Sequence, residues 1–356
     1  MSSANVDTIL AALSRVIEPE LHRDLVSLNM VRDIVVEGDA VRLTLMLTTP
    51  ACPLKSEMKR SVEQAVLAVP GIKRVSVDLK SQVPTAKPVS AELLPGVRHT
   101  IAVASNKGGV GKSTVSVNLA VALSESGARV GLLDADITGP NVPMMLGTRG
   151  TPTMVGDKMG PVEAHGVKVM SIGFFLPAEN KPIIWRGPLI AGAIKQFLGD
   201  VLWGELDYLV IDLPPGTSDA SLSLTQLIPL SGVVIVSTPQ EVALSDVAKS
   251  LGMFKSLNVP VLGLVENMSY FVCPHCGDRT DVFSHGGGQR AAESWGIPFL
   301  GEIPLDPLIR VGGDAGRPIV VDNPESPQSA AFRQLAGAVA SKISVAAFEE
   351  ARSVAR

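Results

Sequence analysis

The sequence predicts an α/β protein with two parts: a doubly wound, mostly parallel sheet and, before it, a small α+β domain. From residue 98 onward, short continuous apolar runs are mostly separated by helical patterns, which is typical of strands and helices that alternate around a parallel sheet. Hydrophobic residues make up 46 % of the 356 residues and aromatic residues only 4 %, so the sheet is expected to be buried and aliphatic. The apolar runs occupy residues 101–104, 130–133, 167–172, 208–211, 233–236, 261–265 and 298–303.

The sequence divides into four segments. Residues 1–80 are expected to form the small α+β domain, and residues 81–97 contain three prolines in a polar stretch, as a linker does. The sheet domain is expected over residues 98–325, and residues 326–356 are expected to form a C-terminal helix. Within the small domain, the patterns predict helices over residues 6–17 and 54–69 and strands over residues 41–47 and 72–79.

Composition and charge exclude several classes of protein. The formal net charge is −4, and both signs are mixed along the chain, unlike a nucleic-acid footprint or a surface for anionic membranes. Three cysteines argue against a disulfide scaffold, and the N-terminus lacks the pattern of a signal peptide. The uncharged window 220–240 contains Pro229 and Pro239, so it predicts a helix, a turn and a buried strand rather than a membrane span. We therefore expect a cytoplasmic protein without nucleic-acid or membrane partners.

Residues 101–120 have the order strand, glycine-rich loop and helix. Glycines let backbone N–H groups turn toward phosphates, and the helix N-terminus adds a positive partial charge. Lys112 can reach the β- and γ-phosphates, and the Ser113 hydroxyl can be a ligand of Mg²⁺. The strict motif has glycine where this chain has Asn106, and the competing interpretation is a glycine-rich turn that binds no ligand. The residues expected to bind ATP are Lys107, Gly108, Gly109, Val110, Gly111, Lys112, Ser113 and Thr114.

The segment Lys107-Gly-Gly-Val-Gly-Lys-Ser113 resembles the deviant P-loop of the class that contains MinD, ParA and the nitrogenase iron protein. In that class the first lysine reaches the nucleotide of a dimer partner, which implies a catalytic role for Lys107 beside Lys112. Phosphoryl transfer needs carboxylates near the metal and near the attacking water. The resemblance implies that Asp136 orients this water and that Asp212 holds Mg²⁺ together with Ser113.

Three further positions lie near the ends of the expected strands. Asn267 matches the position that contacts adenine in the resembled class, and Gly216 matches a position near the γ-phosphate. Asp134 has a plausible alternative role as a helix cap. Because no Asn-Lys-x-Asp follows Asn267, guanine specificity has no support in the sequence.

Cys273-Pro-His-Cys276 is a second candidate site, and three interpretations compete for it. A thioredoxin-like redox pair needs the cysteines at the start of a helix, whereas Gly277 and Asp278 follow here. A zinc site needs four ligands, some of which His275 and His285 could supply. An iron–sulfur cluster needs four cysteines, and one chain offers two at this place.

The order of the motifs resembles the Mrp/ApbC family of iron–sulfur cluster carrier ATPases. The matching motifs are the deviant P-loop, Leu-Leu-Asp134-Ala-Asp136-Ile, Pro-Ile-Ile-Trp185-Arg-Gly-Pro, Ile-Asp212-Leu-Pro-Pro-Gly, Glu-Asn267-Met-Ser, Cys273-Pro-His-Cys276 and the triple glycine from Gly286. The resemblance implies that Cys273 and Cys276 of two subunits hold one [4Fe–4S] cluster between them. It further implies a homodimer whose partners are recipient apo-proteins and assembly factors.

Residues 1–80 resemble a small domain that occurs in iron–sulfur assembly factors. Thr48-Thr-Pro-Ala-Cys52-Pro matches the cysteine loop of that domain. Cys52 is a lone thiol, and an ordinary buried cysteine competes with a transient contact to a cluster or a partner.

The sequence therefore favours a homodimeric ATPase that binds a [4Fe–4S] cluster and delivers it to apo-proteins. Lys107, Lys112 and Asp136 are the expected catalytic residues, and ATP, Mg²⁺ and the cluster are the expected cofactors. Two alternatives stay open. One is a positioning ATPase of the MinD/ParA type, whose basic amphipathic C-terminal helix is not found here. The other is a zinc-stabilised NTPase, in which the cysteines hold a structural metal.

Overall fold

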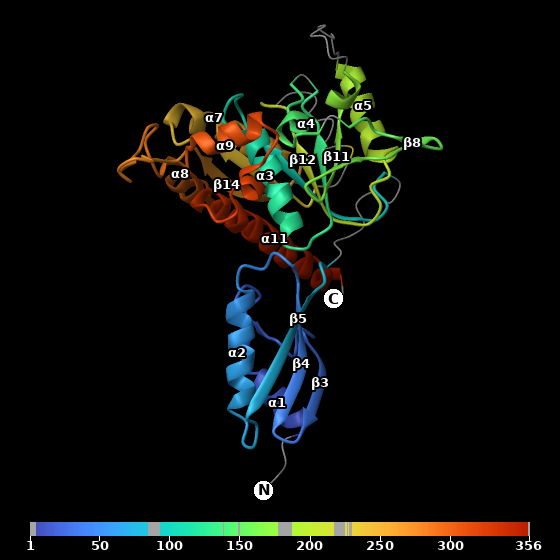
Figure 1. Ribbon diagram of the computed structural model, residues 1–356, viewed down its shortest axis with the longest axis vertical. Coiled ribbons are helices and arrows are strands. Elements are labelled where there is room, and N and C mark those ends of the chain that lie inside the picture. The colour runs from blue at the N-terminus through green and yellow to red at the C-terminus, as the bar shows by residue number, and fades with distance from the viewer. Residues whose placement is uncertain are drawn as a thin grey trace. The chain divides into compact units, whose positions relative to one another are not determined.

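The chain consists of two compact units, shown as a ribbon in Figure 1. The computed structural model describes residues 5–84, 93–137, 139–148, 150–176, 187–216, 225, 227 and 230–354. The first unit comprises Met1–Pro84 and Ala340–Arg356, and the second unit comprises Thr85–Val339. The sequence did not indicate that the end of the chain groups with its beginning. The bounds of the four predicted segments stay predictions.

A central sheet forms the core of the second unit. Its strands, as far as the structure describes them, follow the order β10-β11-β7-β12-β6-β13-β14-β17 and run parallel, except for the antiparallel pair β10 and β11. Every residue of β7, β12 and β13 is buried, which explains the continuous apolar runs in the sequence. The predicted fold class is confirmed. In sheet order the strands are β10 (Val162–Ala164), β11 (Val167–Ser171), β7 (Val130–Asp134), β12 (Leu206–Asp212), β6 (Val97–Ala104), β13 (Gly232–Ser237), β14 (Val261–Asn267) and β17 (Phe299–Ile303).

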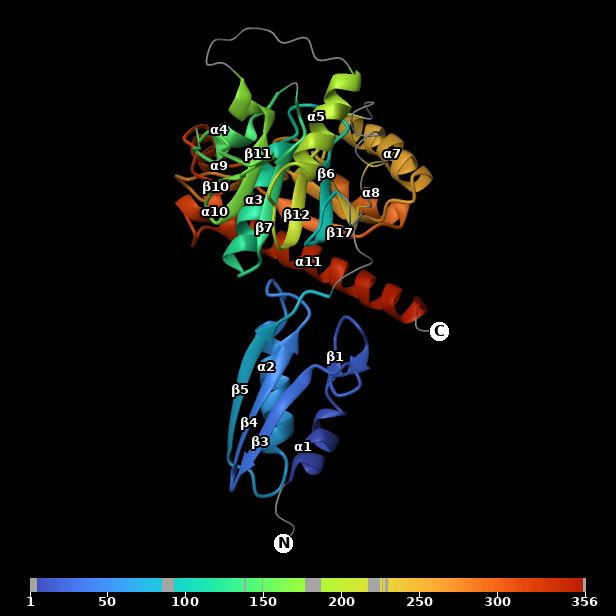
Figure 2. The ribbon, with the colours of Figure 1, turned by 90° about the vertical axis from the view of Figure 1, so that its right-hand side faces the viewer.

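Helices cover both faces of this sheet. From β6 the chain crosses through α3 toward one edge, whereas α7 and α8 connect strands that follow one another toward the other edge. Right-handed crossovers in opposite directions place the helices on opposite faces, as Figure 2 shows for α3 against α7 and α8. The helices of this unit are α3 (Lys112–Glu125), α4 (Val142–Met145), η1 (Ile172–Phe175), α5 (Gly187–Gly199), α7 (Glu241–Ser256), α8 (Gly287–Trp295), α9 (Pro307–Asp314) and α10 (Ile319–Asp322). The last helix, α11 (Pro327–Val354), begins in the second unit and belongs to the first unit from Ala340 onward.

Two short hairpins project from the second unit. The pair β8 (Met154–Val155) and β9 (Lys158–Met159) forms one of them, and the pair β15 (Phe271–Val272) and β16 (Arg279–Thr280) forms the other. The second hairpin follows directly after β14 and contains the cysteine pair. Because the parallel strands all end at one edge of the sheet, the loops after β6, β7, β12 and β14 gather there, as expected for a binding site.

In the first unit, two helices pack with a three-stranded sheet of order β3-β4-β5. Its first two strands are antiparallel and its last two are parallel. In this unit, the Ser344 hydroxyl donates to the Thr48 carbonyl at 3.4 Å, and the Arg23 guanidinium lies over the Phe348 ring. The elements are α1 (Val6–Leu13), β1 (Ile17–Glu18), β2 (Arg23–Asp24), β3 (Val31–Glu37), β4 (Ala40–Leu47), α2 (Lys55–Leu67) and β5 (Arg74–Ser81).

Two elements of the first unit differ from the prediction for a clear structural reason. The helix expected over residues 6–17 ends at Leu13, because the residues after it pair as β1 with β2 instead. The last strand covers Arg74–Ser81 rather than residues 72–79, because it pairs with the full length of β4. Strand residues therefore occupy both ends of the expected linker 81–97, and its residues 85–92 lie outside the described part.

In the window 220–240, the expected strand is present as β13, whereas most of the expected helix lies outside the described residues. Within the described part of the chain, no helix combines the length and the apolar character needed to cross a membrane.

Candidate functional site

The glycine-rich loop connects β6 to α3 at the carboxyl edge of the sheet. Gly109 and Gly111 have φ angles of 81° and 82°, in the left-handed region that favours glycine. A Cβ atom at Gly111 would also lie 2.2 Å from the Asn267 amide nitrogen. Glycine at both positions therefore permits this loop conformation directly before the N-terminus of α3, where backbone N–H groups can bind an anion.

Lys112 is buried at the start of α3 and lies between two carboxylates. Its Nζ is 2.8 Å from Asp212 Oδ1 and 3.8 Å from Asp136 Oδ2. The Ser113 hydroxyl donates to Asp212 Oδ2 at 2.6 Å, and the Ser116 hydroxyl donates to Asp212 Oδ1 at 2.6 Å. The ends of β12 and β7 thus bring together four residues that the sequence selected, up to 100 positions apart. Ser116 was not selected, because a serine inside a helix carries no signal of its own.

Asp134, at the end of β7, is fully buried and holds the local backbone. It accepts hydrogen bonds from the Ser171 hydroxyl at 2.9 Å and from the Val142 N–H at 3.3 Å. Because Val142 is the first residue of α4, Asp134 fits the capping alternative. Burial, followed by the nearby charge of Asp212, raises the pKa of Asp134 to about 8. Asp134 thus bonds to the local backbone and to Ser171, whereas the Asp136 carboxylate lies 3.8 Å from Lys112 Nζ.

Lys107 and Asn106 fasten the glycine-rich loop to α7. Lys107 Nζ is 3.0 Å from Asp246 Oδ2 and donates to the Val242 carbonyl at 3.0 Å. The Asn106 amide donates to the Asp246 carbonyl at 2.6 Å and accepts from the Ser250 hydroxyl at 2.7 Å. Lys249 and then Lys107 hold the pKa of Asp246 below its usual value. Lys107 is thus bound within its own chain, and the residue that departs from the motif adds a second attachment.

A cavity of about 680 Å³ opens beside the glycine-rich loop. Its volume lies in the range of small-molecule sites. Asn267 is buried at its wall and donates to the Val110 carbonyl at 2.8 Å, so its amide also fixes the loop. The cavity is lined by the expected residues Lys107, Gly108, Gly109, Gly111, Lys112, Ser113, Thr114, Asp136 and Asn267, and also by Pro304, Leu305, Asp306, Ile309 and Arg310.

Three of the expected residues, Val110, Asp212 and Gly216, do not line this cavity, and one wall was not expected. The Gly216 N–H donates to the Ser105 carbonyl at 2.7 Å. Val110 is buried, and Asp212 lies behind Lys112 and Ser113, to which it is bonded. The wall formed by the start of α9 was missed by the sequence analysis. A proline and an aspartate directly after β17, at Pro304 and Asp306, were its available signal.

The cysteine pair lies in the turn of the β15–β16 hairpin. The Cys273 N–H donates to the Asp278 carbonyl and the Gly277 N–H to the Cys273 carbonyl, both at 2.9 Å. Cys276 is exposed, and its thiol donates to Asp278 Oδ2 at 3.3 Å. Backbone N–H groups of Cys276 and His275, and then the Cys276 side chain, lower the pKa of Cys273. The hairpin therefore presents a thiol whose pKa is lowered. This thiol lies in a turn and not at the helix start that the redox interpretation requires.

No complete metal site forms around the cysteines within the described residues of one chain. His285 does not join them: its Nε2 lies 2.9 Å from Glu302 Oε1 instead. Among the described residues, the group with ligand atoms within 4.8 Å of one another is Glu266, His285 and Glu302. Cys52 lies in the first unit, where it is buried and burial raises the pKa of its thiol.

Comparison with protein families gives two matches that together span most of the chain. The NUBPL iron-transfer P-loop NTPase family matches residues 96–340, and a family of iron–sulfur cluster assembly proteins matches residues 6–79. An iron-sulfur cluster carrier protein of Synechocystis sp. is 49% identical over 348 residues, which cover 96% of this chain and 98% of that protein. An iron-sulfur cluster carrier protein of Escherichia coli K12 is 40% identical over 338 residues, which cover 94% of this chain and 91% of that protein.

Solved structures agree with this assignment of the second unit. A nucleotide-binding protein from Archaeoglobus fulgidus, in complex with ADP and with Co found by PIXE, is 45% identical at a TM-score of 0.59. The match covers 67% of this chain and 93% of that one. The septum site-determining protein MinD from Pyrococcus horikoshii, complexed with Mg-ADP, is 26% identical at a TM-score of 0.50. That match covers 67% of this chain and 94% of the MinD chain. The family resemblance that the motifs indicated is thereby confirmed.

Proposed function

Because this chain belongs to the family of NUBPL iron-transfer P-loop NTPases, we propose that it carries a [4Fe–4S] cluster to apo-proteins and hydrolyses ATP. The observation that supports the carrier role most directly is the β15–β16 hairpin, which presents two thiols at its tip. Backbone N–H groups lower the pKa of Cys273, and the thiolate is the form that binds iron. The relatives named iron-sulfur cluster carrier proteins align over nearly the whole chain.

Ligand counting supports a cluster shared by two subunits. A [4Fe–4S] cluster has four irons that each take a terminal ligand, usually a cysteine thiolate. One hairpin offers Cys273 and Cys276, and no third ligand joins them among the described residues. Two chains around a two-fold axis bring two identical hairpins together, because such a contact uses the same surface twice. The cluster then has four cysteine ligands.

The glycine-rich loop supplies the groups that ATP hydrolysis needs. Lys112 would exchange its two carboxylate contacts for phosphate oxygens, and Ser113 with Asp212 would hold Mg²⁺. Asp136, which lines the same cavity, would orient the attacking water. Lys107 would leave Asp246 and Val242 to reach the nucleotide of the partner subunit, so nucleotide binding and dimer formation would be coupled.

The carrier role is tested by anaerobic reconstitution of the full chain with iron and sulfide. We expect a dimer with about four irons and four sulfides per two chains, matching one [4Fe–4S] cluster. The loaded protein is then mixed with a cluster-dependent apo-enzyme, with and without ATP, and activation of that enzyme is followed. A fully loaded monomer contradicts the shared cluster, and failure to activate any apo-enzyme contradicts delivery.

A zinc-stabilised NTPase is the second candidate, because two thiols in a tight turn also suit zinc. The cobalt found in the Archaeoglobus fulgidus relative is compatible with a divalent metal on this fold. Stoichiometric zinc without sulfide in protein purified under strict anaerobiosis supports this candidate. Charge-transfer absorption in the visible range after reconstitution supports the cluster.

A further inference from the structure

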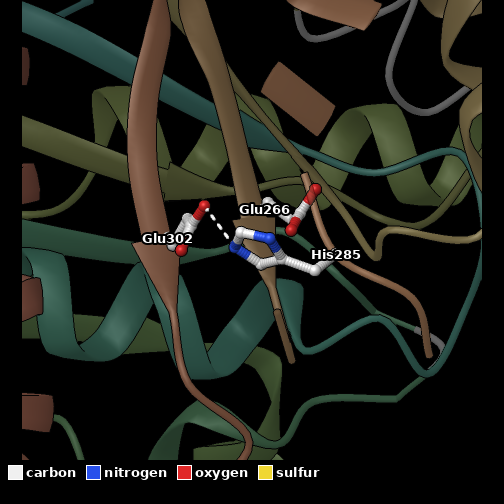
Figure 3. A group of neighbouring side chains, drawn as sticks. All are labelled: Glu266, His285 and Glu302. Carbon is white, nitrogen blue, oxygen red and sulfur yellow. Dashed lines mark hydrogen bonds and ion pairs between the residues drawn. The ribbon is translucent and has the colours of Figure 1, made fainter. Parts of the chain in front are cut away.

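Three side chains with metal-binding atoms converge near Tyr270, the residue before the cysteine hairpin. Figure 3 shows the His285 ring between the carboxylates of Glu266 and Glu302. Glu266 comes from β14 and Glu302 from β17, the neighbouring strand, while His285 precedes α8. The ligand atoms of the three residues lie within 4.8 Å of one another. The three residues come from separate segments, so only the tertiary structure creates this cluster.

Part of the cluster has a structural role. Glu266 is fully buried and accepts from the Ser269 hydroxyl and from the N–H groups of Gly286 and Gly288, at 2.5, 3.1 and 2.5 Å. These bonds tie the N-terminus of α8 to β14 and compensate the buried charge. Each carboxylate oxygen has two lone pairs, and among the described residues Oε2 of Glu266 accepts only from Gly288. Glu266 therefore keeps an acceptor site besides its structural bonds.

The other two residues form a pair that is open to solvent. His285 Nε2 lies 2.9 Å from Glu302 Oε1, and the side chains are 33% and 24% exposed. An ion can therefore enter from the solvent side, while the buried carboxylate of Glu266 forms the floor. The Ser284 backbone before His285 has a φ angle of 73°, which is uncommon for a residue other than glycine. His285 directly follows this left-handed residue and lies before the N-terminus of α8.

We propose that Glu266, His285 and Glu302 form a site for one divalent transition-metal ion, separate from the cysteine pair. Nitrogen and oxygen ligands lie about 2.0–2.2 Å from such an ion, so ligand atoms are at most ~4.4 Å apart. The present spacing reaches this with shifts of a few tenths of an ångström. One imidazole with two carboxylates suits Fe²⁺, Co²⁺ or Zn²⁺ better than Mg²⁺, which prefers oxygen ligands only. On binding, His285 exchanges its hydrogen bond to Glu302 for the metal, and any proton on Nε2 goes to solvent.

Ring contacts connect this site with the cysteine hairpin. The Tyr270 ring meets the His285 ring edge-on, with centroids 6.3 Å apart. The Arg279 guanidinium also lies over the Tyr270 ring, 4.0 Å from the ring centroid. Arg279 belongs to β16 of the hairpin, and Tyr270 directly precedes β15. The His285 ring of the proposed site is thus in contact with the side chain at the base of the hairpin.

The experiment removes the thiols first, so that it does not depend on the proposed cluster. The Cys273→Ser/Cys276→Ser variant of the full chain, without a histidine tag, is titrated with Co²⁺ in millimolar Mg²⁺. We expect one Co²⁺ per chain, with weak visible bands of nitrogen and oxygen ligands and no thiolate charge-transfer band. Zn²⁺ should displace the Co²⁺ and raise the melting temperature, because an ion that binds the folded state stabilises it.

Two further substitutions in this background locate the ion. His285→Ala should abolish the bands, whereas the matched control His275→Ala, at an exposed histidine of the hairpin, should keep them. Glu302→Gln can still accept from His285, so it should fold normally. Since losing even an outer partner of a metal ligand weakens binding about 10- to 100-fold, Glu302→Gln should weaken Co²⁺ binding at least tenfold.

Either of two results overturns the site. The first is no Co²⁺ binding by the folded Cys273→Ser/Cys276→Ser variant. The second is Co²⁺ binding that is unchanged by both His285→Ala and Glu302→Gln. Loss of the cluster in the cysteine variant together with retained Co²⁺ binding would support both the cluster ligands and this site.

Discussion

The two cysteine loops of this chain share a Cys-Pro step in sequence but lie in different environments in the structure. Both contain a cysteine followed by proline, at Cys52-Pro53 and at Cys273-Pro274. Cys52 is buried among the aliphatic side chains of the first unit, and burial raises the pKa of its thiol. Cys273 lies in a hairpin turn, where the N–H groups of Cys276 and His275 lower the pKa of its thiol.

This difference shows that burial and backbone geometry, rather than the proline beside it, decide what a cysteine can do. A thiol inside an apolar core is a small hydrophobic side chain and stays protonated. A thiol at which several N–H groups point is stabilised as thiolate, the form that binds metals. Cys276, three residues after Cys273, adds a second thiol to the hairpin, while the Cys52 loop has none.

The largest difference between the two loops should appear in the amount of cluster that the protein binds after a cysteine is replaced. Cys273→Ser and Cys276→Ser should each lose the reconstituted cluster, because two of its four cysteine ligands disappear from the dimer. Cys52→Ser should keep it, because a buried thiol with a raised pKa is a poor ligand. Bound iron and sulfide per chain measure both effects. A comparable loss of iron in Cys52→Ser would end the distinction between the loops.

Lys112→Ala sharpens the comparison by separating the hairpin from the phosphate loop. Removing a group that stabilises the transferred phosphoryl group costs roughly 10²–10³ in rate, so the rate of phosphate release from ATP should fall by that factor. Cluster assembly on Cys273 and Cys276 should stay unchanged, because the two sites use different loops. Near wild-type hydrolysis in this variant would contradict the assignment of the glycine-rich loop.

Asp136→Ala should bind nucleotide as the wild type does and lose hydrolysis.

Alkylation compares the thiols directly. Iodoacetamide reacts with thiolate, so the rate at each cysteine follows its ionised fraction. The lowered pKa of Cys273 makes its rate rise and level off at a lower pH than an ordinary thiol, whereas the rate at Cys52 should rise only at higher pH. Near pH 7, Cys273 should react at least about tenfold faster than Cys52. Peptide mass spectrometry of partly alkylated native protein, with a denatured sample as control, measures this ratio. Equal rates in the native protein would contradict it.

The free energy of unfolding should show the smallest effect. Here the replacement in the Cys52 loop should matter more than the replacement in the hairpin. Cys52→Ala removes a buried atom from a packed core and should lower the free energy of unfolding of the first unit by about 1 kcal/mol. Cys276→Ala changes an exposed side chain and should stay within about 0.5 kcal/mol. Urea denaturation followed by circular dichroism measures both. A larger loss in Cys276→Ala would mean that its thiol helps to hold the hairpin.

The sequence by itself determined the fold class and the two candidate sites. Continuous apolar runs mark strands that are buried on both faces, and this pattern is local, so β7, β12 and β13 can be recognised from their own residues. The phosphate loop is equally local, because glycines, lysine and serine act within one turn of chain. The Cys-x-x-Cys spacing also needs no distant residue. Family membership followed from the order of such local motifs.

Only the tertiary structure decided the contacts between residues that lie far apart in the chain. The structure joins Asn106 to Ser250 and Ser116 to Asp212 by hydrogen bonds, and no sequence motif contains both partners of either bond. The structure pairs His285 with Glu302, although the sequence analysis considered His285 as a ligand together with the cysteines. The physical reason is that hydrogen bonds and ion pairs act over a few ångströms of space. Sequence patterns record spacing along the chain, and the crossovers of the sheet determine which distant segments come within that range.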